Sequence, residues 1–348
     1  MRLLIAGLGL IGARHLRHAL ALPGIEVVGA IDPARTQDAV PQFDSPEAVD
    51  VAADAIVIAT PTHLHQEHAE AAAARGWHML IEKPVAHSVA AADRIAGAAE
   101  AAGVQVLVGH HRRHHARVAA LKAMLEAGEI GAPVAASMIW AMKKPNAYFE
   151  GNWRSGADGS PVMINLVHEV DLLRHLFGDV TGVKGAGSNA QRGADRVESG
   201  AAILEFGGGV VATIAFADTT PSPFGFEAGT GENPNIAMTS QDYLQIMGTK
   251  GAVSFPSLTV WSGAADWSEA PKAVKRDIKD NVPLDAQLLH FADVWAGRTP
   301  PMISAREGKK SLAATLEIEA GVTAGLRGRE TSPAASARPP AETLLGSG

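Results

Sequence analysis

The sequence predicts a two-domain α/β protein: a doubly wound parallel sheet followed by an α+β domain with a largely antiparallel sheet. In the first third, short apolar segments alternate with Ala-rich helical segments, which is the pattern of a parallel sheet covered on both faces. After residue 121, strands with two-residue alternation follow one another between glycines, as in antiparallel hairpins. The length of 348 residues exceeds the usual size of one domain. We therefore expect domains at 1–120 and 121–328.

Composition excludes several kinds of protein. There is no cysteine, so disulfides and thiolate metal ligands are excluded. The formal charge of −7 argues against nucleic acid as a partner. No stretch approaches the roughly 20 apolar residues of a membrane span, and glycines interrupt the apolar start, unlike a signal peptide. We expect a soluble, cytoplasmic protein without a membrane partner, and a disordered Pro/Ala/Ser-rich tail at 329–348.

The elements of the first domain follow from apolar runs and their punctuation. Gly76 is expected to end one helix, while Ser88 caps the start of another and Gly103 ends it. The expected strands are 2–8, 25–32, 55–60, 78–83 and 104–109, and the expected helices are 11–22, 63–76 and 88–103. Each strand is nearly all apolar, as burial on both faces requires.

The second domain is expected to mix strands and helices less regularly. The expected helices are 118–131, 163–178, 284–296 and about 305–325, and the strands lie in 133–142, 180–188, 200–217 and 242–261. Between two of these, the turn-rich stretch 218–235 carries no clear periodicity. We take it as a hypothesis that this stretch is a mobile lid, because long unstructured insertions are often functional.

Three glycines mark a nucleotide-binding turn. Gly7, Gly9 and Gly12 spell G-x-G-x-x-G between the first strand and the first helix, where glycine permits a tight turn and close approach of a pyrophosphate. Asp32 ends the second strand twenty residues after Gly12, where a carboxylate suits a ribose 2′-hydroxyl and repels a 2′-phosphate. The pattern predicts a Rossmann domain that binds NAD. Arg35 could partly offset Asp32, so NADP stays possible.

Six further segments occur in the order expected of one family. They are ATPTHLH (59–65), IEKPVA (81–86), VGHHRRH (108–114), NLVHEVD (165–171), IMGTKGAVSF (246–255) and the stretch 287–318. With the glycine loop, they make about the first 327 residues resemble the Gfo/Idh/MocA oxidoreductases, such as glucose–fructose oxidoreductase and inositol dehydrogenase. The resemblance implies a large open C-terminal sheet, a homodimer or homotetramer through that sheet, and reversible oxidation of a secondary hydroxyl of a sugar, cyclitol or related polyol.

Lys83 is the first expected catalytic residue. It ends a parallel strand at the edge where doubly wound sheets bind ligands. The resemblance implies that its ammonium contacts the reacting hydroxyl and the nicotinamide ribose, and that the peptide before Pro84 is cis. A cation there stabilises a developing alkoxide. The expected cofactor-binding residues are Gly7, Gly9, Leu10, Ile11, Gly12, Asp32, Arg35, Thr60, Pro61, His65, Glu82 and Lys83.

His168 is the second expected catalytic residue. Asp171 lies three residues further on the same helix face and could hold the imidazole in one tautomer, so that it takes the hydroxyl proton. The alternative is a packed histidine paired to Asp171. Many family members carry Asp four residues before this histidine, where the chain has Ile164 followed by Asn165. This departure affects substrate specificity more than reaction type.

The remaining expected site residues surround these two. The segment GHHRRHH (109–115) is interpreted as a domain junction whose Arg113 reaches the substrate. Trp153 and Arg154 resemble the family's W-R pair, a substrate wall, although they could instead stack on each other. The expected substrate residues are Arg113, Trp153, Arg154, Asn165 and Asp171. We expect no metal site, because His63, His65 and His68 diverge around a helix.

Rival functions stay open at this point. A dehydrogenase of a cis-dihydrodiol or carboxylated ring could use Arg112, Arg113 and Arg154 as anion contacts. An NAD-dependent glycosidase would reduce its cofactor only transiently. A non-catalytic cofactor-binding regulator is a third class, against which the presence of both Lys83 and His168 argues.

Overall fold

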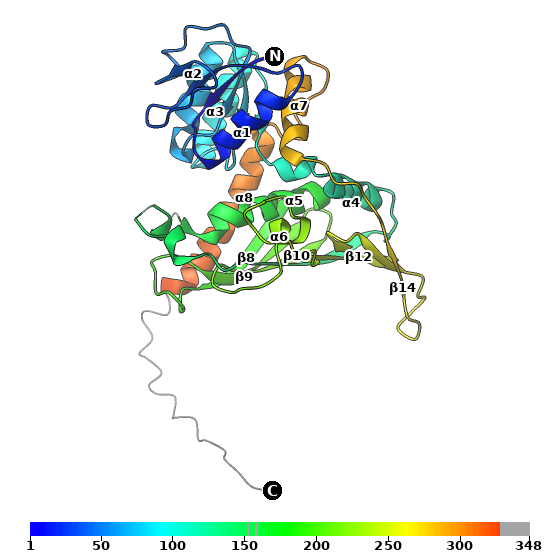
Figure 1. The fold of residues 1–348 in the computed structure, drawn as a ribbon. Coiled ribbons are helices and arrows are strands. Elements are labelled where there is room, and N and C mark those ends of the chain that lie inside the picture. The colour runs from blue at the N-terminus through cyan, green and yellow to red at the C-terminus, as the bar shows by residue number, and fades with distance from the viewer. Residues whose placement is uncertain (152, 157–158, 328–348) are drawn as a thin grey trace.

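The computed structural model describes residues 1–151, 153–156 and 159–327. Figure 1 shows an N-terminal α/β domain stacked against a second domain built on a broad sheet, with α8 (Ala305–Arg327) running from one to the other. The expected disordered tail at 329–348 lies outside the described residues. Within those described, no helix combines the length and apolar character needed to cross a membrane.

The first domain contains a six-stranded parallel sheet. Its strands are β1 (Arg2–Ala6), β2 (Glu26–Ile31), β3 (Gln42–Phe43), β4 (Ala55–Ile58), β5 (His78–Ile81) and β6 (Val106–Val108). They are ordered β3-β2-β1-β4-β5-β6 and all pair in parallel. This is the strand order of a dinucleotide-binding Rossmann fold and confirms the expected fold class. The short β3 had not been expected.

Helices cover both faces of this sheet. The helices of this domain are α1 (Leu10–Ala21), the 3-10 turn η1 (Thr62–Leu64), α2 (His65–Ala74) and α3 (Val89–Ala102). Leu4 of β1 packs among side chains of α2 and α3, while Leu3 and Ile5 pack with α1, because successive strand residues face opposite sides. The expected ends of α3 are confirmed: the Ser88 hydroxyl accepts from the backbone N–H of Ala91, and Gly103 has φ 68°.

The second domain contains an eight-stranded sheet. Its strands are β7 (Pro133–Ala141), β8 (Val180–Ser188), β9 (Ser199–Phe206), β10 (Val211–Ala217), β11 (Leu244–Gly248), β12 (Gly251–Phe255), β13 (Thr259–Ser262) and β14 (Lys272–Lys275). The order is β14-β13-β12-β11-β7-β10-β9-β8, antiparallel except for the parallel pair β7 and β10. The mostly antiparallel α+β fold is therefore confirmed. The exposed edge strand β14 had not been expected.

Helices lie on one face of this second sheet and reach back to the first domain (Figure 1). The helical elements that follow β6 in the chain are the 3-10 turn η2 (His111–His114), α4 (Ala116–Glu126), the short turns η3 (Asn146–Tyr148) and η4 (Trp153–Ser155), a π-helical turn at Val162–Leu166, α5 (Val167–Phe177), α6 (Phe226–Thr230), α7 (Pro283–Trp295) and α8. Leu288 and Phe291 of α7 pack within the core of the first domain. The chain thus returns to its first domain after building the second, and the limits 1–120 and 121–328 stay a prediction.

The stretch 218–235 differs from expectation. It contains α6, whose five residues are all buried. The Phe226 ring lies 6.3 Å from Tyr243 and 5.9 Å from Phe255, centroid to centroid. The idea that the stretch lacks regular structure is therefore wrong for α6, because Phe226 anchors it in the core.

Candidate active site

The glycine loop has the shape that a dinucleotide requires. Gly7 has φ +87°, and a Cβ there would lie 2.7 Å from the backbone of Ala59. A Cβ on Gly12 would lie 1.8 Å from the Gly7 carbonyl oxygen, so only glycine lets α1 approach β1 this closely. A Cβ on Gly9 would meet nothing within 4 Å. Open space at the second glycine, in front of the α1 N-terminus, fits a pyrophosphate held by backbone N–H groups.

Asp32 stands beside this loop at the end of β2. Its Oδ2 accepts from the backbone N–H of Leu8 at 2.7 Å, and its Oδ1 accepts from those of Ala34 and Arg35 at 2.9 and 3.0 Å. The carboxylate is thus fixed next to the glycine loop, and its remaining lone pairs can accept from ribose hydroxyls. Leu10 is 80% exposed at the same edge, and the Arg35 residue is exposed.

His65 ties two loops of this edge together. Its Nε2 lies 2.9 Å from the Thr60 carbonyl oxygen, and its Nδ1 lies 3.1 Å from that of Pro84. His65 is 1% exposed, whereas Pro61 beside it is exposed. His65 therefore holds the loop after β4 against the loop that carries Lys83, and we expect it to act on a cofactor through those loops.

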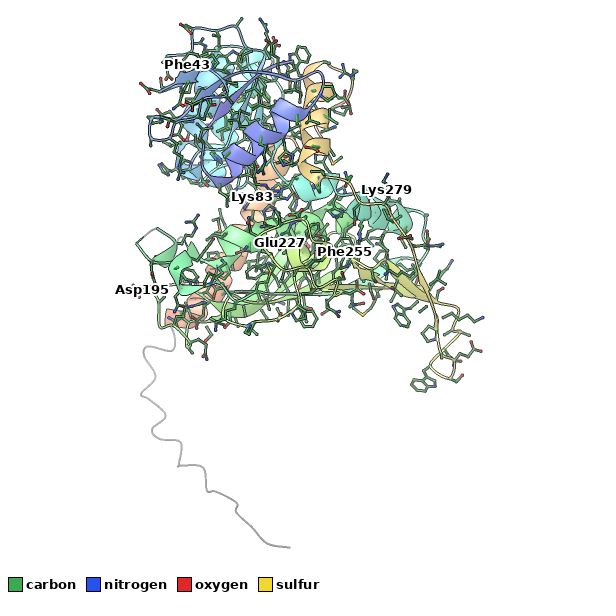
Figure 2. The ribbon with its side chains drawn as sticks, viewed as in Figure 1. Phe43, Lys83, Asp195, Glu227, Phe255 and Lys279 are labelled. Atoms are coloured by element: carbon green, nitrogen blue, oxygen red, sulfur yellow. The ribbon has the colours of Figure 1, made fainter. Side chains whose placement is uncertain are left out.

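Lys83 extends from this second loop to the junction of the two domains, as Figure 2 shows. The Lys83–Pro84 peptide is cis, as the resemblance implies. The Lys83 Nζ donates to the carbonyl oxygen of Ile164 at 3.2 Å. Burial lowers the pKa of the Lys83 ammonium, and the charge of Glu82 opposes that shift.

A π-helical turn shapes the other side of the junction. A helix was expected from 163, but its first turn, Val162–Leu166, is π-helical, with the N–H of Val167 bonded to the Val162 carbonyl. Wider turns of this kind are frequent at functional sites. Here the Ile164 backbone carbonyl contacts Lys83, at the residue where the family's aspartate would stand. The buried Oδ1 of Asn165 has no hydrogen-bond partner among the described residues.

His168 lies one turn after Ile164 and is 8% exposed. Its ring meets those of His111 and His110 edge-on, at centroid distances of 5.4 and 6.1 Å. Its buried Nδ1 has no hydrogen-bond partner in the part of the chain that the structure describes. Burial, together with the charge of Lys83, holds the pKa of His168 well below its usual range. His168 is therefore neutral near pH 7 and can accept a proton.

Asp171 does not bond to His168, contrary to expectation. Its two carboxylate oxygens accept from Arg113 at 2.9 and 2.7 Å, and Ser311 of α8 donates to it at 2.8 Å. Burial raises the pKa of the Asp171 carboxyl, but the nearby His110 and the Arg113 guanidinium outweigh it and lower that pKa. Arg113 and Asp171, both expected to contact substrate, are thus buried and paired with each other, and a substrate role for either stays a prediction.

Arg112 forms a second buried ion network across the domain junction. Its guanidinium donates to Glu169 of α5 at 2.6 Å and to Glu227 of α6 at 2.7 Å, and it lies 4.2 Å above the Phe226 ring. Tyr243 also donates to Glu169, at 3.4 Å. Burial raises the pKa of Glu169, against the opposing Arg112 charge. Arg112 therefore joins three elements from distant parts of the sequence.

The other histidines of GHHRRHH are buried or pair locally. The Nε2 of His111 lies 3.0 Å from Glu232, whose pKa falls to about 2 despite burial because His111 and Arg112 lie beside it. Burial lowers the pKa of His110 to about 4 and that of His114 to about 3. His115 caps α4 through its Nδ1, which accepts from the N–H of Arg117. The segment is a domain junction, as interpreted, but each contact has its own role.

Sequence reasoning missed three residues near Lys83. Glu227 and Glu232 come from the turn-rich stretch, where neither periodicity nor a motif marked them. His15 of α1 bonds to Glu82 at 2.8 Å, and its position three residues after Gly12, on the sheet-facing side of the helix, was an available signal. Figure 2 shows Glu227 across the junction from Lys83.

Two expected substrate residues lie elsewhere in the chain. Arg154 lies 4.9 Å over the Tyr148 ring, and the Trp153 side chain lies outside what the structure describes.

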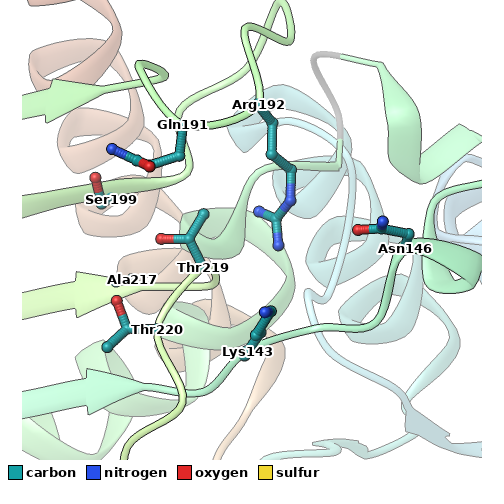
Figure 3. Close-up of a pocket in the computed structure, with 8 residues that line it drawn as sticks. All are labelled: Lys143, Asn146, Gln191, Arg192, Ser199, Ala217, Thr219 and Thr220. Atoms are coloured by element: carbon teal, nitrogen blue, oxygen red, sulfur yellow. The ribbon is translucent and has the colours of Figure 1, made fainter.

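No metal group is found among the described residues: they hold no cluster of three or more His, Cys, Asp or Glu side chains that could bind an ion. A cavity of about 440 Å³ lies where β9 begins and β10 ends, and Lys83 is not among its lining residues (Figure 3). In that cavity, Arg192 is paired with Asp218, and Lys143 adds a cation among hydroxyl and amide side chains.

The strand order and the glycine loop define a dinucleotide-binding Rossmann domain. A family profile described as "Oxidoreductase family, NAD-binding Rossmann fold" matches residues 1–110, and one described as "GFO/IDH/MocA C-terminal domain" matches residues 118–254. The chain belongs to the GFO/IDH/MocA family, as its motifs indicated.

The curated proteins that this chain resembles are named for different molecules. A stretch of 180 residues is 34% identical to 1,5-anhydro-D-fructose reductase of Ensifer adhaerens, covering 50% of this chain and 54% of that protein, so the match spans about half of the reductase. The chain is 24% identical to scyllo-inositol 2-dehydrogenase (NAD(+)) of Bacillus subtilis over 93% of each chain. An Agrobacterium radiobacter oxidoreductase, crystallised with NAD+, L-tartaric acid and magnesium, shares the fold with a TM-score of 0.78 at 16% identity, over 94% of this chain and 97% of that one.

Proposed function

We propose that the protein transfers hydride between NAD and a secondary hydroxyl or ketone of a sugar, cyclitol or related polyol. The observation that carries this proposal is an ammonium, Lys83, bonded to the Ile164 carbonyl four residues before the buried histidine His168, whose pKa lies well below its usual range. When bound, the nicotinamide ring supplies the hydride acceptor. Lys83 stabilises negative charge on the reacting oxygen, and His168 takes the proton of the hydroxyl. A cytoplasmic location stays a prediction.

The direct test is a substrate panel assayed with NAD and NADP separately. We expect nucleotide reduction with at least one inositol, aldose or sugar derivative, and faster turnover with NAD. Chromogenic glycosides in the same panel distinguish a glycosidase, which would release sugar without net NADH. Binding of nucleotide with no turnover of any class of compound would favour a non-catalytic regulator and contradict the proposal.

A carboxylated ring is the second candidate substrate. Lys144 favours it, because its buried Nζ has no hydrogen-bond partner among the residues that the structure describes. This Nζ lies 5.6 Å from the Trp140 ring and 5.0 Å from the Tyr148 ring. Burial lowers the pKa of Lys144 to about 8. Against this candidate, the guanidinium groups of Arg112 and Arg113 are already paired with carboxylates. Faster turnover of sugar acids than of the matching neutral sugars would support it.

Replacing Asp32 by alanine is expected to weaken the preference for NAD. The ribose hydroxyls lose a charged acceptor, a change of roughly 1.5–3 kcal/mol, so the KM for NAD should rise by about 10- to 100-fold. NADP should lose the repulsion by this carboxylate and bind relatively better. The measurement is kcat/KM for both nucleotides, with the exposed Asp50→Ala variant as control. An unchanged ratio of the two values would assign nucleotide choice to other residues.

The outer face of the second sheet is the proposed subunit contact. Large apolar side chains point outward from five strands; they are Ile139, Ile203, Val211, Met247 and Trp261, each 38–42% exposed. We expect the double variant Ile203→Lys, Met247→Lys to reduce the mass in multi-angle light scattering to that of a monomer. The control is Val282→Lys, an exposed position outside the sheet. A monomeric wild type, or an unchanged assembly in the double variant, would contradict this contact.

A further inference from the structure

Three sequence motifs meet at the Glu82 side chain. His15 lies in the helix that the glycine loop opens, Glu82 precedes Lys83, and Gly109 begins the GHHRRHH segment. The Nε2 of His15 lies 2.8 Å from Glu82 Oε1, and His15 and Glu82 are 0% and 5% exposed. A buried carboxylate is unfavourable unless it is paired, so the contact with His15 stabilises the buried charge of Glu82.

The surroundings fix Glu82 tightly. Its Oε2 accepts from the backbone N–H of Lys83 at 3.2 Å. A Cβ on Gly109 would lie 3.0 Å from both the Cα and the Cδ of Glu82, so the missing side chain leaves room for this carboxylate. The backbone N–H of Glu82 bonds to Ile58 of β4 at 2.9 Å. These hydrogen bonds therefore hold the Glu82–Lys83 peptide in place relative to the sheet and to α1.

Glu82 is also a charge next to Lys83. Its pKa falls to about 2 even though burial opposes this, because His15 bonds to it and Lys83 lies beside it. Three other charged groups act on Lys83. The positive charge of Arg112 lowers the pKa of the Lys83 ammonium, whereas the negative charges of Glu227 and Glu232 raise it. Besides burial, the charge of Lys83 lowers the pKa of His168 and that of His110. The negative charge of Glu82 therefore favours the charged form of Lys83.

We propose that Glu82, held by His15, is a positioning residue for Lys83: it fixes the peptide from which Lys83 extends and keeps the Lys83 ammonium charged. This inference rests on the proposed role of Lys83 in hydride transfer. It assigns His15 a place in the site without contact to substrate. It also connects α1, whose N-terminus is expected to bind the cofactor phosphates, with Lys83, which is proposed to act on the reacting hydroxyl.

The test measures the charge on Lys83 without requiring turnover. The rate of acetylation of Lys83 by acetic anhydride, quantified by mass spectrometry against pH, gives the pH at which the amine becomes reactive. We expect that midpoint to move down by about one pH unit or more in Glu82→Gln, which keeps the size and loses the charge. The control Glu100→Gln removes a surface carboxylate that pairs with Arg306 and should leave the midpoint unchanged.

The activity readouts then separate positioning from general stability. In Glu82→Gln, the alkaline limb of kcat/KM should move down with the acetylation midpoint. In His15→Gln, kcat should fall about 10-fold or more while the KM for NAD stays near the wild-type value. His18→Gln is the matched control, because His18 lies on the same helix and pairs with Asp285 near the surface.

The outcomes distinguish this inference from the proposed function. If no polyol is oxidised but the acetylation midpoint moves, the inference about the Lys83 charge stands and the proposed function fails. An unchanged midpoint in folded Glu82→Gln overturns the inference, whatever the activity. If Glu82→Gln does not fold, His15→Gln decides: a kcat equal to that of His18→Gln overturns it.

Discussion

Replacing His168 by glutamine is expected to lower kcat by about 10²- to 10⁴-fold, the usual contribution of a general base. Glutamine keeps a polar side chain of similar length but cannot take up the proton of the reacting hydroxyl. The affinity for NADH, measured by fluorescence titration, should stay near the wild-type value, because His168 lies on α5 of the second domain.

The lowered pKa of His168 also predicts how kcat/KM depends on pH. The folded protein lowers the pKa of His168 below 6.5, chiefly by burial, so its neutral form persists into mildly acidic solution. Wild-type kcat/KM should hold its plateau through pH 6.5 and fall only below it, as His168 gains a proton. The control is His175→Gln, two turns further along α5. Equal losses of kcat in the two variants would remove His168 from the chemistry.

Replacing Arg112 by methionine is expected to destabilise the fold by about 3–5 kcal/mol, the usual effect of removing one partner of a buried ion pair. Arg112 is 2% exposed and is bonded to two carboxylates, those of Glu169 and Glu227. Without the guanidinium, two negative charges stay buried near each other. The free energy of unfolding, from urea denaturation followed by circular dichroism, measures the change.

Two further variants test the cause of that loss. Arg117→Met removes a more exposed arginine that pairs with Asp280, and it should change the free energy of unfolding by about 1 kcal/mol or less. Adding Glu169→Gln and Glu227→Gln to Arg112→Met should recover part of the stability, because the buried charges are then gone. Similar losses in Arg112→Met and Arg117→Met, or no recovery in the triple variant, would contradict the network's role.

Local patterns predicted most of the fold. The parallel sheet followed from apolar strands between helices, and the ends of α3 followed from Ser88 and Gly103. The elements that were missed depend on distant contacts. The strand β3 has only two residues, β14 is short and exposed at all four residues, and α6 is buried because Phe226 packs against Tyr243 and Phe255. Neither length nor periodicity marks such elements.

Sequence motifs predicted several residues of the candidate site, but they did not predict which of these residues pair with each other. The glycine loop, Asp32, Lys83 and His168 were each expected, and in the structure the Lys83 Nζ bonds to the carbonyl of Ile164, four residues before His168. The pairing of Asp171 with Arg113 was missed, because spacing along a helix says which face residues share and nothing about partners from another domain. The π-helical turn before His168 was also missed, since apolar periodicity does not distinguish it from an α-helix.

The most direct test of the central claim is the fate of the hydrogen on the reacting carbon. A polyol that the panel identifies as a substrate is deuterated at its oxidised carbon, and the reduced nucleotide is analysed by mass spectrometry. We predict that the wild-type enzyme transfers the deuterium to the nicotinamide ring, and that Lys83→Met forms little reduced nucleotide. Reduced nucleotide without deuterium, or wild-type activity in Lys83→Met, would contradict the account.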